Sequence, residues 1–110
     1  MNTKKDHKIL EALQDTLKSR KRELPDNSYV SELFKSGNKA INAKIIEEAN
    51  EYIEAVSDKT KNEMIHEAAD LWFHNLVSLT LNDIQVNDIL EELNKRFGVS
   101  GLEEKKSRDK

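Results

Sequence analysis

The segment from Lys61 to Leu81 places the strongest constraint on the fold, because hydrophobic residues cover well over half of its circumference on a helical wheel. A helix of this kind has to bury most of its surface against other elements. The narrow strip that remains carries Glu63, Glu67, Asp70 and His74 at the spacing i, i+4, i+7, i+11. The sequence therefore predicts a mostly buried helix that also carries an acidic strip.

The rest of the chain also has helical periodicity, and no window alternates polar and apolar residues as a strand does. One proline and three glycines in 110 residues leave few interruptions. The spacing predicts helices over residues 7–22, 29–34, 38–56, 61–81 and 87–96, with a turn at Pro25, an N-cap at Ser28 and a C-cap at Gly37. We expect an all-α bundle of four to five helices, without a sheet, as a single domain over 1–97. A charged tail over 98–110, expected to be mobile, follows it.

The composition of the chain limits the kinds of partner it can bind and the cellular compartment in which it can be expected. The net charge of −3 argues against nucleic-acid binding through a broad basic surface. The chain has no cysteine, no apolar run of the roughly 20 residues that span a bilayer, and no signal-like core in its first ten residues. We therefore expect a cytoplasmic protein that does not insert into membranes. Only 36% of residues are hydrophobic, which predicts a small core completed by homodimerisation.

A second group of carboxylates lies on the predicted 38–56 helix. Glu48 falls at the edge of its apolar stripe, and Glu51, three residues later, is its neighbour on the helix surface. Glu67 and Asp70 have the same three-residue spacing on the 61–81 helix. Two interpretations stay open: the acidic strips are solvated faces, or they face each other across two antiparallel helices.

The facing arrangement points to a metal site. Carboxylates held close together repel one another, and a divalent cation removes that repulsion. Ligand sets made only of carboxylate oxygens suit hard ions such as Mg²⁺ or Mn²⁺, and bundle cores build metal sites from side chains on facing helices. Because Mg²⁺ takes remaining ligands from substrate phosphates, the pattern favours metal-dependent phosphate chemistry.

The motif E-E-x-x-E, here Glu47 to Glu51, is followed by E-x-x-D, here Glu67 to Asp70. This pair of motifs resembles that of the MazG-like all-α nucleoside triphosphate pyrophosphatases. The surrounding text, "RKRELPDNSYVSELFKSG", "KIIEEANEYIEA", "EAADLWFHNLVSL" and "ILEELNKRFGVSGLEEK", is similar to the phosphoribosyl-ATP pyrophosphatases of that superfamily. The resemblance runs from about Leu10 into the tail.

The resemblance implies a function and a set of roles. The reaction would be Mg²⁺-dependent hydrolysis of phosphoribosyl-ATP to phosphoribosyl-AMP and pyrophosphate, in histidine biosynthesis. Its metal ligands would be Glu48, Glu51, Glu67 and Asp70. Glu47 would be a further ligand or would position water, so Glu47 and Glu48 are the candidate catalytic residues.

Basic residues and one histidine complete the candidate site. Lys44 matches a lysine that contacts phosphate, although an i, i+4 ion pair with Glu48 explains it equally well. Arg20 and Lys21 match a basic pair, and we favour substrate contact over simple complementation of a helix dipole. His74, one turn after Asp70, is a candidate to hydrogen-bond a carboxylate or a metal-bound water.

Departures from the family's pattern, and two alternatives, bear on this interpretation. Ala43 and Ile46 stand where the family often has lysine and glycine, which puts substrate affinity in question but no metal ligand. The first alternative is a house-cleaning pyrophosphatase that acts on free NTPs or dNTPs with the same metal site. The second is a helical dimerisation module without chemistry, in which the four acidic residues are dispensable.

Overall fold

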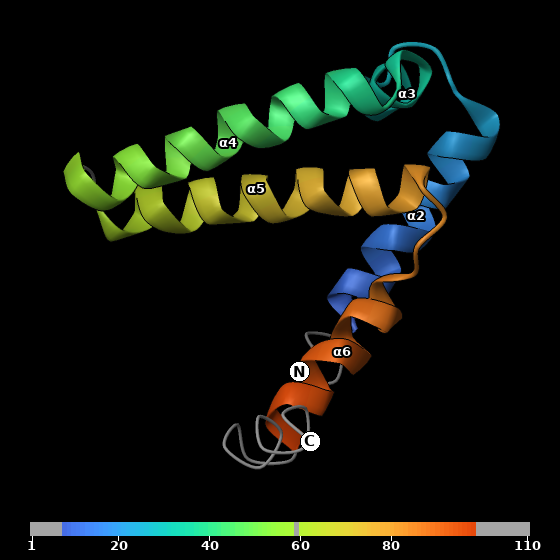
Figure 1. Cartoon of the computed structure of the whole chain (residues 1–110). Helices are drawn as coiled ribbons and strands as arrows, with labels where there is room; N and C mark the ends of the chain where they lie inside the picture. Colours follow the sequence, from blue (N-terminus) through green and yellow to red (C-terminus); the bar gives the residue numbers. More distant parts are fainter. Residues whose placement is uncertain (1–7, 59, 99–110) are drawn as a thin grey trace, which may run out of the picture.

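The computed structural model describes residues 8–58 and 60–98, which form five helices (Figure 1). These are α2 (Ile9–Glu23), α3 (Tyr29–Ser36), α4 (Asn38–Asp58), α5 (Lys61–Leu81) and α6 (Val86–Gly98). No residue in the described ranges is in a strand, which confirms the all-α prediction. None of these helices is long and apolar enough to cross a membrane. Apart from Gly98, the predicted 98–110 tail lies outside the described residues.

Local signals in the sequence fix where the helices begin and end. The Ser28 hydroxyl accepts a hydrogen bond from the Ser31 backbone N–H at 3.2 Å and caps α3, as predicted. In the same way Thr60 caps α5. Gly37 ends α3 with φ of 88°, a conformation that glycine adopts without strain, and α4 starts directly after it. Each predicted helix agrees with the structure to within two residues at either end.

The helices form two diverging pairs (Figure 1). α4 and α5 run antiparallel as a long hairpin. α2 and α6 lie beside each other in a second direction, and α3 lies at the corner where the two pairs meet. The hairpin is therefore covered by other helices only near this corner.

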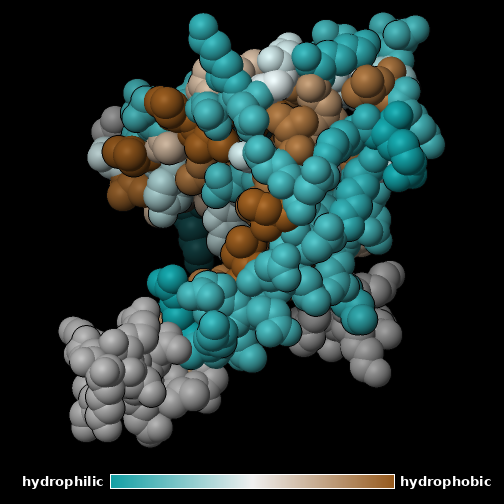
Figure 2. All heavy atoms as spheres, turned by 45° about the vertical axis from the view of Figure 1, so that its right-hand side comes forward, coloured by the Kyte–Doolittle hydropathy of each residue, from teal (hydrophilic) through white to brown (hydrophobic). Residues whose placement is uncertain are grey.

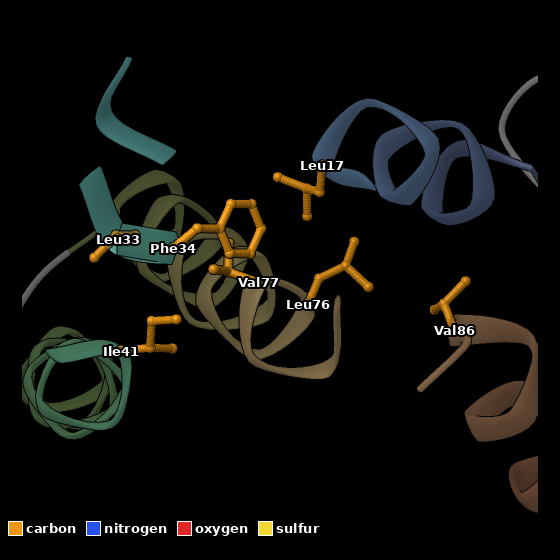
Figure 3. Close-up of a cluster of buried hydrophobic side chains, with 7 residues drawn as sticks. All are labelled: Leu17, Leu33, Phe34, Ile41, Leu76, Val77 and Val86. Carbon is orange, nitrogen blue, oxygen red and sulfur yellow. The ribbon is translucent and has the colours of Figure 1, made fainter. Parts of the chain in front are cut away.

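The hydrophobic core lies at that corner, and every helix contributes to it (Figure 3). The Phe34 ring of α3 lies between Leu17 of α2 and Val77 of α5. The buried members of the core are Leu17, Leu33, Phe34, Ile41, Leu76, Val77 and Val86. This core fixes the corner end of the hairpin and, with it, the relative register of α4 and α5.

A buried glutamine ties α2 to the connection between α5 and α6. Gln14 is only 2% exposed. Its side-chain amide donates to the Thr80 hydroxyl at 3.1 Å and the Ile84 carbonyl at 2.9 Å, and its Oε1 accepts from the Val86 N–H at 2.7 Å. These bonds satisfy buried polar groups at the start of α6.

The outer half of the hairpin exposes apolar side chains, contrary to the expectation that the 61–81 helix buries most of its surface. Ile65 of α5 is 58% exposed, and Ile53 and Val56 of α4 are 61% and 51% exposed. Trp72 of α5, which is 64% exposed, lies nearer the corner, where it lines an apolar groove with Leu10 of α2 and Leu93 of α6. Ala55 is instead the fully buried apolar residue of this part of α4. The cause is that α4 and α5 have only each other as packing partners here. Figure 2 shows several groups of hydrophobic side chains, in brown, reaching one face of the molecule between hydrophilic ones.

Candidate metal and phosphate site

Three of the four predicted ligands lie together between α4 and α5. One carboxylate oxygen from each of Glu48, Glu67 and Asp70 lies within 4.8 Å of the others. Glu48 and Glu67 are each 7% exposed, and Asp70 is half-buried. Glu63, at the start of α5, is exposed and therefore belongs to a solvated acidic face, whereas Glu67 does not.

Glu67 has an environment that disfavours its charge. Burial raises its pKa, and the carboxylates of Glu51, Asp70 and Glu48 raise it further, whereas His66 opposes them. Its Oε1 atom is buried and has no hydrogen-bond partner. A buried carboxylate oxygen without a donor is rare in folded proteins, and a cation is the group that fits it. The fourth predicted ligand, Glu51, influences Glu67 but lies outside the group of three.

This environment gives a prediction for stability in EDTA. Because the pKa of Glu67 is raised, its ionisation destabilises the folded chain as the pH rises through that pKa. Glu67→Gln removes this ionisation, so at pH 7.5 the variant should melt at a higher temperature than the wild type. Below about pH 4, where the glutamate is protonated in both the folded and unfolded states, the difference should disappear.

The matched control is Glu63→Gln, one turn earlier on the same helix and exposed. Its melting temperature should follow that of the wild type at both pH values. Equal melting temperatures of Glu67→Gln and wild type at pH 7.5 would contradict the inferred repulsion.

Lys44 lies at the rim of the cluster. Its ammonium is 3.5 Å from a Glu48 oxygen and 3.3 Å from a Glu47 oxygen. Burial alone would lower its pKa, but Glu47, Tyr29 and Glu48 outweigh burial, and the net pKa is raised. Lys44 therefore stays protonated beside the carboxylates.

The basic pair of α2 lies elsewhere. Lys21 donates from Nζ to the carbonyls of Thr80 and Leu81, both at 3.2 Å, and pairs with Asp83 at 2.7 Å. These partners lie at the end of α5, ten or more residues after Asp70, which is about 15 Å along a helix. Arg20 is in the same last turn of α2. The structure thus gives Lys21 a capping role and does not bring the pair to the cluster.

Two contacts at the site are absent from the sequence interpretation. His66 Nε2 lies 3.5 Å from an Asp70 oxygen. The i, i+4 spacing was the available signal. His74 is buried and bonds to the Asp70 main-chain carbonyl and to Tyr29, not to a carboxylate. Nothing in the local sequence pairs Tyr29 with a residue 45 positions away.

The all-α fold, in which Glu48 of the E-E-x-x-E motif lies with Glu67 and Asp70 of the E-x-x-D motif, is consistent with the MazG-like class of pyrophosphatases. The model of the phosphoribosyl-ATP pyrophosphohydrolase family matches residues 10–97. The chain therefore belongs to the phosphoribosyl-ATP pyrophosphohydrolase family, a family of hydrolases.

Curated relatives agree with this assignment. The phosphoribosyl-ATP pyrophosphatase of Aromatoleum aromaticum is 48% identical over 103 residues, covering 94% of this chain and 95% of the relative. That of Chromobacterium violaceum is 45% identical over 100 residues, covering 91% of this chain and 93% of the relative. That of Neisseria meningitidis is 44% identical over 100 residues, covering 91% and 94%.

Proposed function

We propose that the chain hydrolyses phosphoribosyl-ATP to phosphoribosyl-AMP and pyrophosphate, the second step of histidine biosynthesis. The buried cluster of Glu48, Glu67 and Asp70, in a chain that matches the family over residues 10–97, is the observation that carries this proposal. The relatives bear the name of this activity over nearly the whole chain. We propose a cytoplasmic location for this reaction.

We propose that Glu48, Glu67 and Asp70 hold Mg²⁺ or Mn²⁺, with Glu51 as the fourth ligand. Carboxylate oxygens suit these ions, and the partnerless Oε1 of Glu67 supports the assignment. When bound, the ion supplies Lewis-acid polarisation of phosphate oxygens and lowers the pKa of a bound water.

The chain's own residues then position the substrate and the water. Lys44 provides a protonated amine beside Glu48, where it can bind an oxygen of the phosphates flanking the α–β anhydride bond. Glu47 is exposed and 3.3 Å from Lys44, so we assign it the positioning of the attacking water. Positioning and charge stabilisation account for most catalysis of phosphoryl transfer. Arg20 and Lys21 remain proposed substrate contacts, and Lys44 ranks above them because of its place at the cluster.

The test is pyrophosphate release from phosphoribosyl-ATP, ATP and a panel of dNTPs, with Mg²⁺ and then with EDTA. We expect metal-dependent release with a strong preference for phosphoribosyl-ATP. Preference for dNTPs would indicate a house-cleaning pyrophosphatase. That result would contradict the proposed substrate but not the proposed metal site. Absence of release from all of them by folded, Mg²⁺-bound protein would overturn the proposed activity.

We propose further that a second copy of the chain covers the exposed apolar part of the α4–α5 hairpin. Ile46, Ile53, Val56, Ile65 and Trp72 are all more than half exposed there. Full burial of a large apolar side chain contributes about 1.5–3 kcal/mol, so these residues supply a strong drive for association.

Trp72→Glu should convert the dimer to a monomer, because it places a charge within this apolar surface. The measurement is molar mass by light scattering at several protein concentrations. The matched control is Thr16→Glu, which adds the same charge at an exposed position on α2. A wild type that is monomeric at all concentrations, or a Trp72→Glu variant that remains dimeric, would contradict the proposed interface.

A further inference from the structure

Tyr29 combines an exposed side chain with a hydroxyl that is held in place. The residue is 52% exposed, whereas its hydrogen-bond partner His74 is 4% exposed. The Tyr29 hydroxyl oxygen is 2.8 Å from Nε2 of His74, and the two rings meet edge-on with centroids 5.8 Å apart. The other ring nitrogen of His74, Nδ1, is 2.8 Å from the Asp70 carbonyl oxygen. One imidazole ring therefore separates the Tyr29 hydroxyl from the main chain of a proposed metal ligand.

The hydrogen-bond partners fix the polar end of Tyr29. A carbonyl oxygen only accepts, so Nδ1 of His74 carries the hydrogen and donates to Asp70. In the neutral ring Nε2 then accepts from the Tyr29 hydroxyl. Tyr29 thus donates its one side-chain proton inside the protein. What its exposed part offers to a ligand is an aromatic surface and not a hydrogen-bond donor.

Tyr29 lies on the side of the proposed metal site that faces the corner of the fold. His74 is one turn after Asp70 on the same face of α5, and Tyr29 contacts that turn. On the antiparallel α4, Lys44 precedes Glu48 by one turn and therefore also lies toward the corner (Figure 1). The proposed phosphate contact and the exposed tyrosine are thus on the same side of the carboxylate cluster.

The proposed substrate brings a base to the neighbourhood of this cluster. In phosphoribosyl-ATP one ribose joins the purine to the α-phosphate, so a substrate whose α–β anhydride bond lies at the carboxylates places its purine one sugar away. Carboxylate-bound metal and Lys44 suit the phosphates, whereas an aromatic ring suits the purine, because every nucleobase presents a π face for stacking. A ring that is already held in one orientation loses little conformational entropy when it stacks.

We propose that Tyr29 is the stacking platform for the purine of the substrate, and that His74 is a positioning residue that holds the tyrosine ring. This inference rests on the proposed function and adds to it a site for the base. Stacking uses the face of the purine, which ATP and phosphoribosyl-ATP share. Tyr29 therefore increases the affinity for adenine nucleotides in general, and selection between these two depends on contacts to the additional ribose phosphate.

The test uses two probes that do not turn over: magnesium α,β-methylene-ATP, which contains the purine, and magnesium pyrophosphate, which does not. Tyr29→Leu should weaken binding of the first probe by about tenfold or more, the effect of one lost base–aromatic stack, and leave binding of the second within about twofold. KM for phosphoribosyl-ATP should rise by a similar factor while kcat stays within about twofold, because the ring binds the ground state and the transition state alike. Tyr29→Phe keeps the ring without its anchor and should fall between the wild type and Tyr29→Leu.

Phe97→Leu is the matched control, because it removes an aromatic ring from α6 that is 80% exposed. Its affinity for both probes and its KM should equal those of the wild type. Proton NMR gives a second readout, since a purine stacked on an aromatic ring has its H2 and H8 resonances shifted upfield. We expect this shift with the wild type and with Tyr29→Phe, and its loss with Tyr29→Leu.

The possible failures are distinguishable. A wild type that binds α,β-methylene-ATP but releases no pyrophosphate from phosphoribosyl-ATP would overturn the proposed function, and the two probes would still decide the stacking role. Equal weakening of both probes by Tyr29→Leu would indicate a structural role and overturn the stacking proposal. Unchanged affinity of Tyr29→Leu for α,β-methylene-ATP, or a wild type that does not bind this probe, would overturn it as well.

Discussion

Glu67→Gln should reduce Mg²⁺-dependent release of pyrophosphate from phosphoribosyl-ATP by more than about 100-fold. Even residues that only support metal ligands change affinity or activity by about 10–100-fold when mutated, and Glu67 is the most central proposed ligand. It is 7% exposed, contributes an oxygen within 4.8 Å of oxygens of both Glu48 and Asp70, and has an oxygen without a hydrogen-bond donor. The amide of glutamine removes the negative charge at this position.

Glu63→Gln is the matched control, because it makes the same chemical change one turn away on the exposed start of α5. It should retain turnover and Mg²⁺ affinity within about twofold. Circular dichroism should show equal helix content for both variants, so the loss in Glu67→Gln cannot be attributed to unfolding. Full turnover by Glu67→Gln would remove the metal assignment and favour a module in which the acidic residues are dispensable.

The sequence was sufficient to predict the helices and their approximate ends, and the pairing of Glu48 with Glu67 and Asp70 was one of its two open interpretations. Helical periodicity and caps such as Ser28 act over a few residues, so they can be recognised without knowledge of the fold. The three-residue spacings place the carboxylates on defined helix faces. The antiparallel pairing of α4 and α5 then follows from their short connection.

The burial pattern of the hairpin was harder to predict. A helical wheel identifies the apolar side of α4 but not which part of that side another helix covers. Ala55 is buried against α5, whereas Ile53 and Val56 are exposed, because the other helices contact the hairpin only at the corner. The missing information is the packing partner, which in this region we propose to be a second copy.

Contacts between residues far apart in the chain also could not be predicted from the sequence. Lys21 caps the carbonyls at the end of α5, and Tyr29 bonds His74, across separations of 59 and 45 residues. A single sequence carries no periodicity that links such positions. For this reason the sequence analysis could not assign either of these two contacts.

Gln14→Met should destabilise the chain by about 2–4 kcal/mol, because it preserves the approximate volume of the side chain and removes three hydrogen bonds. The buried N–H of Val86 and the carbonyl of Ile84 would lose the partner that joins α2 to the start of α6. For a chain of this size the change corresponds to a melting temperature lower by roughly 10–20 °C, measured by circular dichroism. Gln85→Met is the matched control at an exposed position, where it removes only a solvent-exposed hydrogen bond from Lys18, and it should change stability by less than about 1 kcal/mol. If the two variants melted together, the Gln14 hydrogen bonds would not be what fixes the second helix pair to the hairpin.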